Sequence, residues 1–431
     1  MALFESTLTL LLAAIALLQV SRRFAIPYPT MLALAGVVVA ALPWAPNIGI
    51  DPHLALALFI APALLDAAYD LPPRAIRRNW APLLALAAIA VLLTTAAVAW
   101  AGVALAGLPL AAAIALGAIV APPDAAAATA MLDRFALPRR TVTILKGEGL
   151  LNDAVALLIF SAAVSATAAQ SLSGILPALA LAVPGGLLLG ILIGKVYLVL
   201  AARLAGTLGG MLFQFVATFG AWLIADRLRV SAILTVAAYA MTIARYIPER
   251  QSPRDRVLSY SVWEVAIFLL NVLAFLLTGM QARAIVMRLD PGRTGRALGF
   301  AAVVLVIVIV VRLAWVMTYN WAARRVSLMR GGPALPTVAQ GLLVSWCGMR
   351  GLITLATALA LPQSFPSRDL IVLSALAVVL GTLILQGLTL GPLIRRLRFQ
   401  PDSSLANETA SARVALLDAA GASLDGCEDD G

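Results

Sequence analysis

The sequence predicts an all-α polytopic membrane protein with about thirteen transmembrane helices. Hydrophobic residues make up 62% of the 431 residues and charged residues only 12%, and the mean hydropathy is +0.98. Soluble domains carry about 45–50% apolar and about 25% charged residues, so this chain has too little polar surface for a water-facing fold. Its apolar runs, such as residues 301–311, are continuous, which excludes the alternating pattern of a membrane barrel.

Thirteen apolar stretches lie between arginine, proline and glycine residues, and each is long enough for a transmembrane helix. The N-terminus lacks the layout of a secretory signal, so we expect its first stretch to be a retained helix. The predicted spans lie near residues 4–20, 27–43, 52–69, 80–105, 109–132, 139–163, 174–202, 208–226, 230–246, 258–280, 296–320, 335–361 and 369–394.

Two parts are expected from the composition. Residues 1–398 form the transmembrane domain, and residues 399–431 form a short acidic cytoplasmic tail, which carries seven acids against one base, Arg413. Such a tail is typical of a solvated and partly disordered segment.

The formal net charge of +10 reflects the membrane topology of the chain. With the N-terminus outside, the inward loops and the C-terminal edge hold 19 arginines and the outward loops hold 7. Cytoplasmic loops of membrane proteins are enriched in Lys and Arg. The count therefore predicts a multi-pass protein of the bacterial inner membrane with a cytoplasmic C-terminus, and it removes the need for a nucleic-acid partner.

The chain has few of the residues that metal sites and redox sites need. Cys347 and Cys427 form no CxxC or Cys/His pattern, so we expect neither a disulfide nor a zinc site. The single histidine, His53, follows Pro52 at the start of an apolar run, which favours an interfacial position. No cofactor is expected.

The densest polar cluster in the apolar part of the chain is in the sixth span. Glu148 and Asn152 are four residues apart and share a helix face, with Asp153 next to it. Two carboxylates and an amide can surround a small cation with oxygen ligands. Removal from bulk water also favours the protonated carboxyl form, so the same group can hold a proton or a cation. The alternative is a structural ion pair with Lys146 or with an arginine of another span.

Two spans carry interruptions at mid-membrane. Pro122 and Pro123 precede Asp124 in the fifth span and should break its helix, because each removes a backbone donor. A simple kink with Asp124 as an N-cap is the alternative. Residues 347–351 interrupt the twelfth span. The offset of seven spans predicts inverted repeats of six, and paired broken helices in such repeats are the pattern of a transporter site.

Several segments resemble signature segments of the cation:proton antiporter-one family, the sodium/proton exchangers. The match covers about residues 5–398 and keeps the family order. Its strongest segments are AIVAPPDAAAATAML (118–132), GEGLLNDAVA (147–156), WEVAIFLLNVLAFLLTG (263–279) and GMRGLITLATALALP (348–362), and weaker ones are PALLDAA (62–68) and RLAW (312–315).

The resemblance implies a thirteen-helix fold with two broken crossing helices, a homodimer, and exchange of Na⁺, with Li⁺ or K⁺ as further candidates, for H⁺ in ion transport and pH homeostasis. Asp153 is similar to the family's ion-binding aspartate, and Asn152 to the residue that accompanies electroneutral exchange. Asp124 resembles the acid at the unwound crossing, Glu148 the glutamate one turn earlier, and Arg350 the charge-balancing arginine. The expected Na⁺ ligands are therefore Asp153, Asp124 and Glu148.

This sequence departs from the family pattern at three positions. Gly149 replaces a usual serine and Pro123 a usual threonine, so two ligand hydroxyls are absent. Lys146 stands where the family has an acidic or apolar residue, and it either favours ionised carboxylates nearby or extends to the cytoplasmic mouth.

Asp66, Glu264 and Arg312 also lie within spans and are supporting candidates. Asp66 either lines the site or stabilises the bundle. Glu264 is expected to pair with Arg350 or Arg312, because a charge at membrane depth is costly without a partner.

We expect an antiporter in which H⁺ and a monovalent cation compete for Asp153. A K⁺/H⁺ antiporter on the same scaffold is the first alternative. A cation channel is less favoured because short filter repeats and acid rings are absent from the sequence. An intramembrane hydrolase is disfavoured by the absence of HExxH and GxSxG motifs, so no enzyme is predicted.

Overall fold

Every regular element in the described part of the computed structural model is helical. The structure describes residues 12–13, 15–21, 23, 27–41, 51, 54, 56–69, 73–124, 127–128, 132, 137–167, 172–204, 206–250, 253–287, 294–326, 336–399 and 409–420. The helices, of which η1 and η2 are π-helical turns, are α2 (Tyr28–Ala41), η1 (Leu56–Ile60), α4 (Ala61–Tyr69), α5 (Pro73–Arg78), α6 (Trp80–Leu84), η2 (Ala85–Ile89), α7 (Ala90–Ala106), α8 (Leu110–Val120), α10 (Arg139–Thr167), α11 (Leu172–Arg203), α12 (Leu208–Arg227), α13 (Ala232–Arg250), α14 (Pro253–Val286), α15 (Thr294–Arg325), α17 (Val338–Trp346), α18 (Leu352–Leu359) and α19 (Arg368–Leu397).

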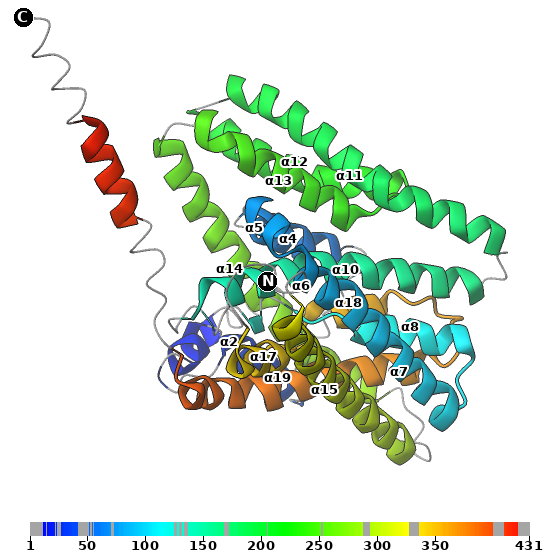
Figure 1. Cartoon of the computed structure of the whole chain (residues 1–431). Coiled ribbons are helices and arrows are strands. Elements are labelled where there is room, and N and C mark those ends of the chain that lie inside the picture. The colour runs from blue at the N-terminus through cyan, green and yellow to red at the C-terminus, as the bar shows by residue number, and fades with distance from the viewer. Residues whose placement is uncertain are drawn as a thin grey trace, which may run out of the picture.

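Within the described chain, seven helices are long and apolar enough to cross a membrane, and shorter apolar helices complete the bundle. Their order follows the predicted spans from the second onward. Much of the first span and all of His53 lie outside the described residues. In the tail, residues 409–420 form a helix with exposed side chains, which Figure 1 draws in red, apart from the bundle.

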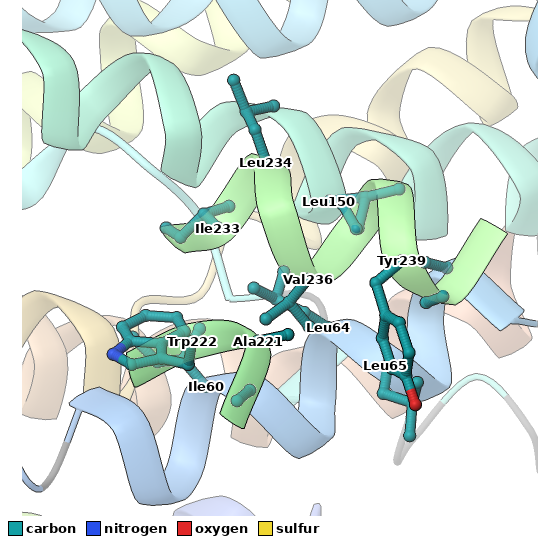
Figure 2. Close-up of a cluster of buried hydrophobic side chains, with 14 of the residues drawn as sticks. Ile60, Leu64, Leu65, Leu150, Ala221, Trp222, Ile233, Leu234, Val236 and Tyr239 are labelled. Carbon is teal, nitrogen blue, oxygen red and sulfur yellow. The ribbon is translucent and has the colours of Figure 1, made fainter. Parts of the chain in front are cut away.

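Two groups of helices pack on either side of α10. Helices α11, α12 and α13 lie together on one side, and α7, α8, α15 and α19 on the other (Figure 1). Figure 2 shows the first core, where α4, α12 and α13 meet around Leu64, Trp222 and Val236. Leu150 of α10 reaches into this core, and α10 also packs on α8. Helix α10 therefore carries its polar residues between the two groups.

The helix pairings repeat with an offset of seven spans. Helix α4 of the third span packs on α13 of the ninth, and α14 of the tenth packs on α2 of the second. In the same way α7 packs on α8, and α15 on α17. These contacts have the pattern of two related halves.

A π-helical turn attaches the fourth span to the eleventh. Such a turn leaves the regular backbone pairing of an α-helix, and in η2 the carbonyl of Ala85 accepts a hydrogen bond of 2.9 Å from Nε1 of Trp315. Trp315 belongs to the RLAW segment, so this segment fixes α15 against the fourth span.

Candidate functional site

The fifth span breaks where the proline pair predicts. Helix α8 ends at Val120, residues 121–124 are not helical, and helical backbone is found again at residues 127–128. Pro122 and Pro123 lack N–H donors, so the carbonyls of the preceding turn lose their helical partners.

The twelfth span is broken as well. Helix α17 ends at Trp346 and α18 begins at Leu352, which leaves residues 347–351 as the link between two half-helices. The two predicted interruptions are therefore both present.

Groups in each of the two breaks form hydrogen bonds with backbone groups of the other. The N–H of Asp124 donates to the carbonyl of Met349 at 2.7 Å. The guanidinium of Arg350 donates in the opposite direction, from Nε to the Val120 carbonyl at 3.0 Å and from one terminal nitrogen to the Ala121 carbonyl at 2.9 Å. Non-helical backbone at membrane depth is tolerated only when such groups find partners. Arg350 thus supplies donors to the Val120 and Ala121 carbonyls at the break.

A threonine of α19 holds the second break in place. The backbone N–H of Arg350 donates to Oγ1 of Thr382 at 2.9 Å, and the Arg350 guanidinium also donates to the carbonyl of Gly348. Arg350 is only 1% exposed. Sequence reasoning did not single out Thr382, although a hydroxyl in a long apolar span was a usable signal.

Asn152 connects α10 to the first break. Its Nδ2 donates to the carbonyl of Pro123 at 3.0 Å, while its buried Oδ1 has no hydrogen-bond partner among the described residues. Asp153 follows it and is 4% exposed. A buried amide oxygen without a partner and a buried carboxylate each cost free energy unless a proton or a cation is supplied.

Asp124 is half-buried at the same crossing. One carboxylate oxygen accepts a long hydrogen bond of 3.4 Å from the N–H of Ala127, and the carboxylates of Asp124 and Glu148 both lie within electrostatic reach of Asp153. Over the described residues, no three His, Cys, Asp or Glu side chains lie close enough together for a metal site. The oxygens at the crossing belong to carboxylates, to the Asn152 amide and to the backbone.

Glu148 does not have the place that the sequence predicted for it. Both of its carboxylate oxygens accept hydrogen bonds from Arg312, at 2.5 and 3.0 Å, and both side chains are almost fully buried. Arg312 also donates to the carbonyls of Val344 and Ser345 at the end of α17. Both carboxylate oxygens of Glu148 are therefore paired with the Arg312 guanidinium. The alternative, an ion pair with an arginine of another span, is the observed arrangement.

The expected pairing of Glu264 is also wrong. Glu264 is exposed on α14, whereas Arg312 and Arg350 are buried and bonded to the groups described above. Asp66 lies elsewhere, on α4, where it lines a pocket between α4, α12 and α14 together with Arg256.

Two broken helices that cross inside a bundle of apolar helices, next to a buried carboxylate, define a secondary transporter of the inverted-repeat class. The chain belongs to the sodium/hydrogen exchanger family, whose transmembrane region matches residues 8–396. It is therefore a multi-pass membrane protein of a cation/proton exchange family and not an enzyme.

Relatives agree with this assignment, and a solved structure agrees with the fold. The chain is 31% identical, over 92% of its length and 75% of the relative's, to an uncharacterized Na⁺/H⁺ exchanger of Mycobacterium tuberculosis. It is 30% identical to the sodium, potassium, lithium and rubidium/H⁺ antiporter of Bacillus pumilus, over 88% of this chain and 60% of that one. The fold matches the sodium proton antiporter MjNhaP1 from Methanocaldococcus jannaschii with a TM-score of 0.71 and 17% identity, over 93% of this chain and 99% of that one.

Proposed function

We propose that the protein exchanges Na⁺ for H⁺, with Li⁺ or K⁺ as further substrates, by competition of the two ions for Asp153. The single observation that carries this proposal is the buried Oδ1 of Asn152, which has no hydrogen-bond partner among the described residues and belongs to the residue before the buried Asp153, at a crossing of broken helices. A proton on Asp153 or a cation between these oxygens removes the cost of a buried unpaired charge.

The remaining ligands come from the crossing itself. Asp124 supplies a second carboxylate, and backbone carbonyls and water complete the shell. Glu148 serves as a positioning residue, because its ion pair with Arg312 holds α10 against the end of α17. Arg350 offsets the negative charge of Asp124 and Asp153 and donates to the carbonyls at the break that follows α8.

Exchange is obligatory in this scheme because one carboxylate cannot hold both ions. The bare carboxylate is too costly to carry across the membrane, so only the loaded site moves. One cation moves for one proton, and transport is electroneutral. Asn152 supports this stoichiometry because it places an uncharged amide beside Asp153.

The arginine distribution supports an outside N-terminus and a cytoplasmic C-terminus. A homodimer is the assembly implied by the family resemblance. Both remain part of the proposal.

The second candidate is a K⁺/H⁺ antiporter on the same scaffold. Its support is the absence of hydroxyl ligands at Gly149 and Pro123, together with the potassium named for the Bacillus relative. Fewer fixed ligands leave more of the shell to water and carbonyls, which discriminate less sharply between cations.

Proteoliposomes with an internal pH dye test the proposal. Under an imposed pH gradient, Na⁺ added outside should drive proton movement, and a membrane potential imposed without a gradient of Na⁺, Li⁺ or K⁺ should leave the rate unchanged. Half-saturation by K⁺ at a lower concentration than by Na⁺ would replace the first candidate with the second. Ion flux without coupled proton movement would reject both.

A further inference from the structure

Two charged side chains inside apolar spans take no part in the crossing. Lys195 lies in the span Leu181–Arg203 of α11, and Glu264 lies in the span Arg254–Ala282 of α14. Both side chains are exposed, and neither forms an ion pair or a hydrogen bond within the described part of the chain. A charge at membrane depth is costly unless it is paired. Each of the two therefore needs a partner from outside its own protomer.

The two charges lie at a similar depth. Lys195 is eight residues before Arg203, where α11 ends, and Glu264 is eight residues after Arg256, near the start of α14. At 1.5 Å per residue, each charge is about 12 Å along its helix from a basic end. Both of these helix ends face the cytoplasm by the arginine distribution.

Helix α12 lies between α11 and α14 at this depth. The ring of Phe213 stacks on Tyr197, two residues after the lysine, with ring centroids 5.3 Å apart. The ring of Phe215 stacks on Trp263, the residue before the glutamate, with centroids 4.3 Å apart. One turn of α12 therefore contacts both flanking helices beside their charges.

The outward side chains of this turn of α12 are apolar. Leu212 is 67% exposed and Val216 is 66% exposed. The α11–α12–α14 surface therefore carries a positive charge on one flank, apolar side chains in the middle and a negative charge on the other flank. A twofold rotation about the membrane normal places α12 against α12 of a second copy and α11 against its α14, and it preserves depth. The surface is thus complementary to itself.

We propose that the α11–α12–α14 surface binds a second copy of the chain, with Lys195 of each protomer paired to Glu264 of the other. Two ion pairs then flank an apolar contact, and neither charge faces lipid without a partner. This inference deepens the homodimer proposed above by naming its contact. It does not depend on which cation is transported.

The test is the monomer–dimer equilibrium of the full-length protein in phosphatidylcholine vesicles, measured by single-molecule photobleaching over a dilution series. Lys195→Glu and Glu264→Lys should each weaken dimerisation about tenfold, because like charges then meet at both contacts. The double variant, which exchanges the two charges, should restore the wild-type affinity. Asp369→Lys is the matched control, because Asp369 is an exposed acid of α19 in the other group of helices, and it should keep the wild-type affinity.

Neutral variants keep the test decisive if a reversed variant does not fold. Lys195→Gln and Glu264→Gln each leave the partner's opposite charge without a counter-ion, so each should weaken the dimer. The double variant should lose less than the sum of the two single losses. Coupled exchange and the thermal unfolding of the monomer should be unchanged in all of them, because neither side chain is bonded within its own protomer.

A dimer that both reversed variants leave unchanged would overturn the ion pair and leave the homodimer standing. A double variant as weak as the two single losses combined would also overturn it, since the two charges would then act on separate partners such as lipid headgroups. A monomeric wild type would overturn the ion pair and the homodimer together. The exchange assay is a separate measurement, so its failure would reject ion exchange and not this interface.

Discussion

The backbone of Gly351 lies directly against the carboxylate of Asp124. A Cβ added at Gly351 would lie 2.9 Å from Cβ of Asp124 and closer still to its carboxylate. The close approach is possible only because position 351 has no side chain. The two broken helices therefore meet at a contact that specifies glycine in one and permits an acid in the other.

Gly351→Ala should displace Asp124 and strongly reduce exchange. The overlap forces backbone or carboxylate to shift, at a cost of about 1–3 kcal/mol. Gly299→Ala on α15 is the control, because an added Cβ there meets no atom within 4 Å. Cation-dependent proton flux should fall in the first variant and not in the second. Equal activity of the two would show that the crossing tolerates a displaced Asp124.

The Glu148–Arg312 ion pair should be asymmetric in its response to mutation. Removal of one member leaves a buried uncompensated charge and costs about 3–5 kcal/mol, whereas replacement of both by apolar residues costs less. Arg312→Met should therefore lower the midpoint of thermal unfolding more than the double variant Arg312→Met with Glu148→Leu. If the double variant were less stable than the single one, the pair would not be the source of the effect.

Glu264 provides a matched comparison for a carboxylate outside the site. Because Glu264 is exposed and Glu148 is buried, Glu264→Gln should change neither unfolding nor exchange, while Glu148→Gln should lower stability. Loss of exchange in Glu264→Gln with unchanged stability would return Glu264 to the transport site.

Competition for Asp153 predicts a definite pH dependence. A fall in pH raises the fraction of protonated Asp153, so more cation is needed for half-maximal exchange. Where the protonated form dominates, one pH unit should raise the half-saturating Na⁺ concentration about tenfold, because each ion excludes the other from one site. The measurement is a set of Na⁺ titrations at several fixed, equal internal and external pH values. A half-saturating concentration independent of pH would mean that the two ions use separate groups.

Local sequence features predicted the fold and both helix breaks. Long apolar stretches identify spans because each must satisfy its backbone in lipid, and Pro122 and Pro123 identify the first break because proline acts on its own turn. The partner of Glu148 could not be found in this way. Arg312 is 164 residues away, and hydropathy does not indicate which face of α15 turns toward α10.

The error at Glu264 has the same physical origin. A charge in an apolar stretch suggests a buried partner, but Glu264 lies on an exposed face of α14. The position of a residue within an apolar stretch does not show whether its side chain is buried or exposed. Thr382 was missed because its role depends on the backbone of Arg350. Contacts between spans that are distant in sequence are thus the part of the site that could not be predicted from the sequence.

Competition requires that Asp153 binds both ions, and Asp153→Asn removes this ability. The asparagine keeps the size and one oxygen of the side chain but can neither ionise nor take up the transported proton. In proteoliposomes, radioactive Na⁺ uptake driven by a pH gradient and Na⁺-driven proton movement should both be abolished in protein that unfolds at the wild-type temperature. Full coupled exchange in this variant would show that another group binds the two ions.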